Sequence, residues 1–142
     1  MKKQIILVGL LSVLGGCTGT NNEIIVDKSL TDIYSTAYTE FNDENYEAAA
    51  TEFLKAESQH PASPWAPDAL IMAAYSYYMD NDFAGAILTT DRFMRFHPGH
   101  KDVPYVMYLR AMCHYRQVSD VRREPGESAY ALQQFQTLVQ RF

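Results

Sequence analysis

The strongest constraint on the fold is a stretch that reads as a helical hairpin. Residues 69–79 are apolar and aromatic, the turn Asp80-Asn81-Asp82 follows, and a second helical pattern runs from Phe83 to Phe96. Pro98 ends this pattern, because proline lacks a backbone N–H and does not fit inside a helix. A single hairpin of this size cannot bury its apolar faces alone. The stretch therefore predicts similar neighbours in the same chain.

The hairpin recurs along the chain at an offset of 37 residues. This offset aligns small residues, aromatic residues and prolines: Ala37 with Ala74, Tyr38 with Tyr75, Tyr46 with Phe83, Ala49 with Ala86, and Pro61 with Pro98, and a further step reaches Ala111 and Tyr115. Small residues let helices approach closely, and aromatic rings fill the space between them. The pattern resembles that of tetratricopeptide repeats, whose two-helix unit recurs about every 34 residues. We expect an all-α tetratricopeptide-repeat solenoid of three helical hairpins, which is curved and has a concave aromatic face.

The N-terminus reads as an export signal. Two lysines precede an apolar run over residues 5–14, which is shorter than the about 20 residues that span a bilayer. Leu14-Gly15-Gly16-Cys17 ends the run and resembles a bacterial lipobox, in which the cysteine becomes the lipidated first residue after cleavage. We expect residues 1–16 to be a lipoprotein signal peptide and Cys17 to be the lipidation site. An ordinary signal peptide with an incidental cysteine is the alternative.

The rest of the chain divides into a tether and the repeats. Residues 17–29 are mostly polar, and we expect them to form a lipid-anchored flexible tether. Residues 30–142 should form the tetratricopeptide-repeat domain, with repeats at about 30–62, 64–99 and 102–142. No polar closing helix follows the third repeat, although solenoids shield their last apolar face with a terminal cap. We therefore expect the chain to be truncated at its C-terminus, or its last helix to dock onto a part that is absent here.

Charge and cysteine content exclude several classes of function. The 12 basic and 17 acidic residues give a formal charge of −5, and loss of Lys2 and Lys3 with the signal peptide would leave 10 basic residues against 17. This balance excludes nucleic acid as a partner, because such binding needs a basic surface. Membrane attachment is then expected through the N-terminal lipid. Once Cys17 is acylated, Cys113 has no cysteine to pair with, and its place on a packed helix predicts a buried, inert thiol.

No pattern in the sequence predicts catalysis. There is no Gly-rich phosphate loop, nucleophile elbow or tight carboxylate constellation. His60, His97 and His100 fall between the expected helices and could approach one another, but their spacing matches no strong metal motif. We expect no catalytic residue, no cofactor and no metal, and a periplasmic hydrolase is the least favoured alternative.

Three segments give a more specific resemblance. They are Asp91 to His100 (DRFMRFHPGH), Tyr105 to Ala111 (YVMYLRA), and Arg123-Glu124-Pro125 ahead of Ala129. They resemble the BamD family, outer-membrane lipoproteins of the β-barrel assembly machinery, and the lipobox and the first repeat agree with it. The chain departs from the family in having three repeats where members typically have five, and in reading Arg-Glu-Pro where the family has Arg-Asp-Pro.

The resemblance implies a function and its partners. It implies a non-enzymatic scaffold, lipid-anchored at the periplasmic face of the outer membrane, that helps recognise unfolded outer-membrane proteins and supports their folding and insertion. The implied partners are a BamA-type barrel subunit, the other Bam lipoproteins, and the C-terminal segments of unfolded outer-membrane proteins. The alternative is another tetratricopeptide lipoprotein, such as a pilotin for secretin or pilus assembly or a cell-envelope coordinator.

The candidate binding surface consists of tyrosines on the first helix of each hairpin, which lines the concave side of such a solenoid. We predict that peptide or partner binding uses Tyr34, Tyr38, Tyr75, Tyr78, Tyr108 and Tyr115. Their rings offer apolar area, and their hydroxyls can bond the backbone of an extended peptide. Packing inside the core is the alternative for each ring, because aromatic residues at helical spacing are usually interior.

Overall fold

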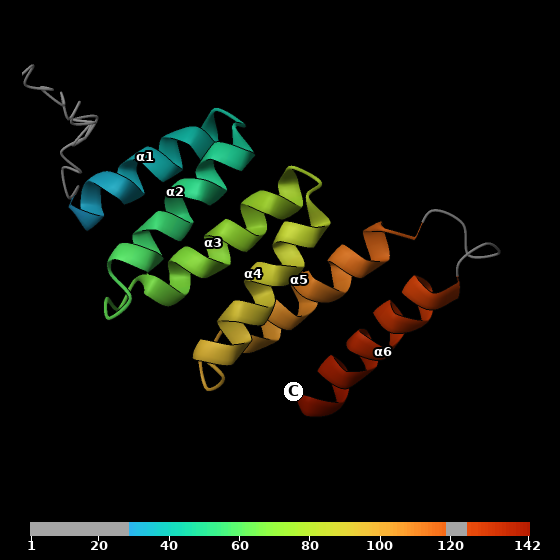
Figure 1. Cartoon of the computed structure of the whole chain (residues 1–142). Coiled ribbons are helices and arrows are strands. Elements are labelled where there is room, and N and C mark those ends of the chain that lie inside the picture. Colours follow the sequence, from blue (N-terminus) through green and yellow to red (C-terminus); the bar gives the residue numbers. More distant parts are fainter. Residues whose placement is uncertain (1–28, 119–124) are drawn as a thin grey trace, which may run out of the picture.

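The computed structural model describes residues 29–118 and 125–142. Within these residues the chain forms helices α1 (Leu30–Asn42), α2 (Tyr46–Gln59), α3 (Ala66–Met79), α4 (Phe83–Phe96), α5 (Val103–Arg116) and α6 (Pro125–Arg141). They pack in chain order as three helical hairpins that lie side by side (Figure 1). This arrangement confirms the prediction of an all-α, tetratricopeptide-like stack of three hairpins.

Part of the predicted organisation lies outside the described residues. This part comprises the signal peptide over residues 1–16, the lipidation site Cys17, and almost all of the tether over residues 17–29. Among the helices of the described part, none combines the length and the apolar character that crossing a membrane requires.

The helix boundaries follow from local side-chain chemistry. Ser29 caps α1 by accepting the N–H of Asp32 at 3.2 Å, and Asp82 caps α4 by accepting the N–H of Gly85 at 2.9 Å. A Cβ at Gly85 would lie only 2.3 Å from Asp82 Oδ2, so a larger residue there would force the capping carboxylate to shift. Asn81, with φ of 63°, turns the chain between α3 and α4, and asparagine tolerates that conformation.

Small residues at the predicted positions bring the helices together. Ala37, Ala74 and Ala111 on the first helices, and Ala49, Ala86 and Ala131 on the second helices, are all buried. Larger side chains fill the remaining space in two clusters. Phe53 and Ile33 lie in the cluster shared by α1, α2 and α3, while Phe93 and Leu70 lie in the cluster shared by α3, α4 and α5. Each hairpin is therefore buried against its neighbour, as the repeat predicted.

Candidate functional site: the tyrosine surface of the first helices

Tyr34 is the predicted site residue that lies deepest. Its side chain is only 8% exposed, and its ring packs edge-on against Phe53 at 5.8 Å between centroids. Its hydroxyl donates a hydrogen bond to the backbone oxygen of Trp65, which ties α1 to the segment before α3. Burial, and secondly the charge of Asp68, raise the pKa of Tyr34 well above its usual value of 10.0. Tyr34 thus offers a ligand little surface of its own.

Tyr38 stands beside a small hollow at the start of α3. We call this the Trp65 hollow; its volume is about 250 Å³ and it is lined by Tyr34, Tyr38, Trp65 and Asp68. The Tyr38 and Trp65 side chains are 44% and 48% exposed, so both present aromatic surface to solvent. The ring of Tyr38 is held by an edge-on contact with Phe53 at 5.2 Å.

Four tyrosines of α3 and α5 form a second group. We call Tyr75, Tyr78, Tyr105 and Tyr108 the tyrosine cluster. Tyr75 and Tyr78 stack at 6.4 Å between ring centroids. Burial raises the pKa of Tyr105, and the neighbouring hydroxyls of Tyr75, Tyr108 and Tyr78 raise it further. Because Tyr105 and Tyr108 are also exposed, the cluster offers both rings and hydroxyls to a ligand.

A contact on α1 joins the cluster to the first hairpin. Phe41 lies 5.8 Å from Tyr75 between ring centroids, and it is one helical turn from Tyr38. The aromatic surface therefore runs from α1 through α3 to α5. Of the six predicted residues, five lie in the Trp65 hollow or the tyrosine cluster.

Tyr115 lies apart from the other predicted tyrosines. It is 59% exposed and borders a different hollow of about 310 Å³ between α5 and α6, whose lining also includes Val118, Ser128, Ala131, Leu132 and Phe135. The next residue, Arg116, turns toward the α3–α4 turn, with its guanidinium 5.7 Å from the Tyr78 ring and a hydrogen bond to Asn81 Oδ1 at 3.2 Å. Phe135 of this hollow lies 6.2 Å from Tyr108 between ring centroids, whereas no ring contact joins Tyr115 itself to another predicted tyrosine among the described residues.

Two residues of the aromatic surface were not singled out from the sequence. Tyr105 precedes Tyr108 by one helical turn, and this spacing would have placed both on one face of α5. Trp65 precedes α3, where helical periodicity gives no direction for a side chain. Its position depends on the contact with Tyr34, at 5.2 Å between ring centroids and 74° between planes.

The loop histidines do not converge as a group of three. His100 instead lies with Asp68 and Asp102, where one oxygen or nitrogen of each is within 4.8 Å of the others. These groups are of a kind that can hold a divalent cation, but exposed acidic groups are common without one, and we assign none. Cys113 is buried, and burial raises the pKa of its thiol to about 12, which keeps it protonated and unreactive.

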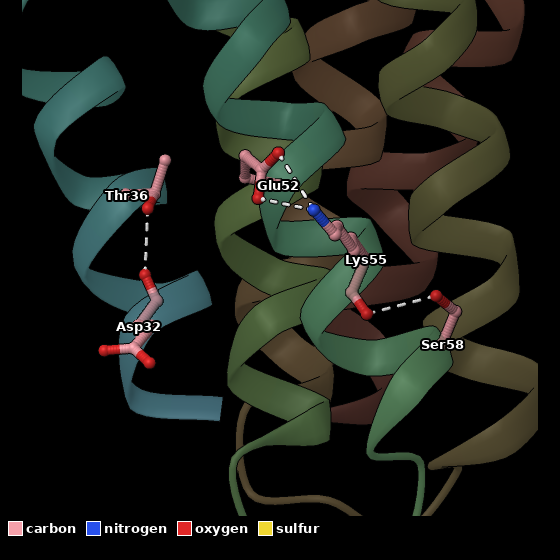
Figure 2. A network of polar contacts seen from close by, with 5 residues as sticks. All are labelled: Asp32, Thr36, Glu52, Lys55 and Ser58. Atoms are coloured by element: carbon pink, nitrogen blue, oxygen red, sulfur yellow. Dashed lines mark hydrogen bonds and ion pairs between the residues drawn. The ribbon is translucent and has the colours of Figure 1, made fainter. Parts of the chain in front are cut away.

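Polar contacts on the outer parts of α1 and α2 are local. Figure 2 shows Thr36 donating to the Asp32 carbonyl at 2.9 Å, Lys55 reaching the Glu52 carboxylate at 3.4 Å, and Ser58 donating to the Lys55 carbonyl at 3.1 Å. Each contact joins residues of one helix. These three contacts therefore stabilise single helices and do not join α1 to α2.

The chain is similar to known proteins over most of its length. A family model described as "YfiO: Outer membrane lipoprotein" matches residues 26–142. The chain belongs to this family. Membership in the YfiO family confirms the resemblance drawn from the sequence and identifies the chain as one of a family of outer-membrane lipoproteins.

Curated relatives carry the name outer membrane protein assembly factor BamD. The protein from Caulobacter vibrioides is 32% identical over 132 residues, covering 91% of this chain and 43% of the relative. The protein from Neisseria meningitidis serogroup B is 32% identical over 157 residues (100% and 59%), and that from Rickettsia prowazekii is 28% identical over 138 residues (97% and 54%). The chain thus spans about half the length of these relatives. Their names describe an assembly factor for outer-membrane proteins.

Proposed function

We propose that the protein is a lipid-anchored scaffold of the outer-membrane β-barrel assembly complex, and that it helps recognise unfolded outer-membrane proteins and supports their folding and insertion. Family membership supports this role, since the relatives are named assembly factors for outer-membrane proteins. The lipid would be carried by Cys17, which places the repeats at the periplasmic face of the outer membrane. Its partners would be a BamA-type barrel subunit and the other lipoproteins of the complex.

The observation that carries the recognition step is the exposed tyrosine cluster. An unfolded outer-membrane protein presents extended segments, and we propose that its C-terminal segment binds here. Rings of Tyr105 and Tyr108 would cover the apolar and aromatic side chains of the segment, and tyrosine hydroxyls would bond its backbone. Tyr75 and Tyr78 would support the two exposed rings from α3.

Site-directed photo-crosslinking in cells tests this proposal with the protein at its natural length. A photoreactive phenylalanine analogue at Tyr108 should capture unfolded outer-membrane proteins, with more product when their insertion is slowed. The same analogue at Tyr115 is the matched control, because that residue is exposed on the same helix but lies outside the cluster. Equal capture at both positions, or capture at neither, would refute the assignment of the cluster.

Recovery of partners tests the scaffold role separately. A pull-down from detergent-solubilised envelopes should recover a barrel subunit with the lipidated protein. Recovery of a secretin or a peptidoglycan factor without any barrel subunit would point to another kind of envelope lipoprotein.

A further inference from the structure

The Trp65 hollow differs from the rest of the aromatic surface in its composition. Its lining combines the rings of Tyr34, Tyr38 and Trp65 with the carboxylate of Asp68. The Tyr34 ring stands 5.2 Å from Trp65 and 6.2 Å from Tyr38 between centroids, so the three rings form one group. The volume of about 250 Å³ suits a single side chain.

The Asp68 carboxylate lies within 4.8 Å of a ring nitrogen of His100 in the part of the chain that the structure describes. No ion pair joins Asp68 to a lysine or arginine there, whereas Asp91 pairs with Arg110 at 3.0 Å. Asp102 adds a second carboxylate nearby, and its contacts with Lys101 (3.9 Å) and His100 (3.5 Å) engage those two residues. The lining of the hollow therefore contributes one carboxylate, that of Asp68, which no lysine or arginine pairs with among the described residues.

Aromatic faces also carry negative potential, and they attract cations that lie over the ring. Elsewhere in the chain, arginine side chains form cation–π contacts with such rings. Arg116 lies 5.7 Å from the Tyr78 ring and Arg110 lies 6.0 Å from the Tyr130 ring. Among the described residues, no arginine or lysine lies over Tyr38 or Trp65.

We propose that the Trp65 hollow binds the cationic side chain of an arginine or lysine in the polypeptide that occupies the tyrosine cluster. The ammonium or guanidinium would lie against Tyr38 and Trp65 and pair with Asp68. This inference rests on the proposed function for the identity of its ligand. Phe41 is one helical turn from Tyr38 and lies 5.8 Å from Tyr75 between ring centroids, so the hollow and the cluster lie along one row of aromatic residues. An extended segment that crosses the tyrosine cluster and the Trp65 hollow would thus be recognised by an aromatic side chain at the first and by a positive charge at the second.

Other occupants fit the hollow less well. An apolar side chain would cover the rings but would leave the Asp68 carboxylate against a group that cannot solvate it. An acidic side chain would be repelled by the Asp68 carboxylate. A quaternary ammonium headgroup of a lipid would match the charge, but it would not explain the continuity of the hollow with a peptide-binding surface.

The experiment uses two synthetic peptides with the protein at its natural length. Each is an extended peptide with a C-terminal phenylalanine; one carries a single arginine and the other carries citrulline, which is neutral and of nearly the same shape. Fluorescence anisotropy of a label on the peptide measures total affinity. Emission from Trp65, the sole tryptophan of residues 1–142, reports occupancy of the hollow; any tryptophan beyond Phe142 is replaced by phenylalanine.

We expect the arginine peptide to bind about three- to tenfold more tightly than the citrulline peptide and to shift Trp65 emission. Asp68→Asn removes the charge but keeps the shape, so the preference for arginine should fall toward one. Asp43→Asn is the matched control, because Asp43 is an exposed carboxylate outside the hollow, and it should leave the preference unchanged.

Three outcomes would overturn the inference, and they separate it from the proposed function. Equal affinity for both peptides, with loss of binding on Tyr105→Ala, would refute the cation site and leave the tyrosine cluster intact. Absence of binding by either peptide would refute both. A larger Trp65 response to phosphocholine than to the arginine peptide would assign the hollow to a lipid headgroup.

Discussion

Asp91 on α4 and Arg110 on α5 form an ion pair at 3.0 Å between Oδ1 and Nε. The same guanidinium donates to Gln134 at 3.2 Å and to the hydroxyl of Tyr130 at 3.1 Å, both on α6. Arg110 therefore joins the second hairpin to both helices of the third. Figure 1 shows α6 at the end of the row, where such ties to α5 hold it in place.

Replacing Arg110 should loosen the third hairpin. We expect Arg110→Met, which keeps most of the aliphatic stem, to lower the free energy of unfolding by about 1–3 kcal/mol. The variant should accelerate exchange of the α6 backbone amides with solvent more than it accelerates exchange of the α1 amides. Urea denaturation and hydrogen exchange measure both effects. Lys101→Met is the control, and a loss of stability as large as that of Arg110→Met would show that the ties to α6 are not responsible.

Core truncation should affect stability far more than truncation of an exposed side chain. Phe93 is fully buried between hairpins, so Phe93→Ala should lower the free energy of unfolding by about 3–5 kcal/mol. Leu88 is exposed on the same helix, and Leu88→Ala should change the free energy of unfolding by less than about 0.5 kcal/mol. Similar costs for the two variants, measured by denaturation, would contradict the packing described here.

The buried tyrosine predicts a loss of stability at alkaline pH. The pKa of Tyr34 is raised in the folded state, so below pH 10.0 both states keep the proton and the full contribution is present. As pH rises above that value, the unfolded state ionises first, and stability falls. Tyr34→Phe should cost about 0.5–1.5 kcal/mol at pH 7 because it removes the hydrogen bond to Trp65.

The diagnostic result for Tyr34 is the slope of the free energy of unfolding against pH. Its value at neutral pH is less informative. Denaturation of Tyr34→Phe between pH 9 and pH 11 should show a shallower decline than that of the unmodified protein. An identical slope would mean that other groups dominate the alkaline transition, such as Tyr77 and Tyr105, whose pKa values are also raised by burial.

Lipidation is expected to depend on one cysteine. Cys17→Ser should abolish lipid attachment, seen as loss of the acyl mass, and should move the protein from the membrane to the soluble fraction of the envelope. Cys113→Ala should leave fractionation unchanged, because that thiol is buried within the repeats. Retention of Cys17→Ser in the membrane at the level of the unmodified protein would contradict a lipid anchor at this position.

Helix positions followed closely from the sequence because their causes are local. The turn at Asn81 and the stop before Pro98 predicted a helix over 83–96, which are the bounds of α4. The offset of small residues likewise predicted that Ala37 and Ala74 would be buried. Such inferences are strong in a repeat protein, since the same pattern recurs at equivalent positions of each hairpin.

The candidate site was less accessible to sequence reasoning because it depends on contacts between helices. Tyr34 and Tyr108 occupy equivalent positions in their repeats, yet Trp65 and Phe53 cover Tyr34, while Tyr108 is 46% exposed. Repeat position fixes the helix face of a residue but not what lies over it. The same limit explains why Trp65 was not singled out.

The central claim is that the tyrosine cluster binds C-terminal segments of unfolded outer-membrane proteins. The most direct test is the affinity of a labelled peptide ending in phenylalanine for the protein at its natural length and for Tyr105→Ala/Tyr108→Ala, with circular dichroism to confirm that the fold survives. Both rings are partly exposed, so the double variant should lose some stability but stay folded, and it should bind the peptide at least about tenfold more weakly. Unchanged affinity in the folded double variant would contradict the account.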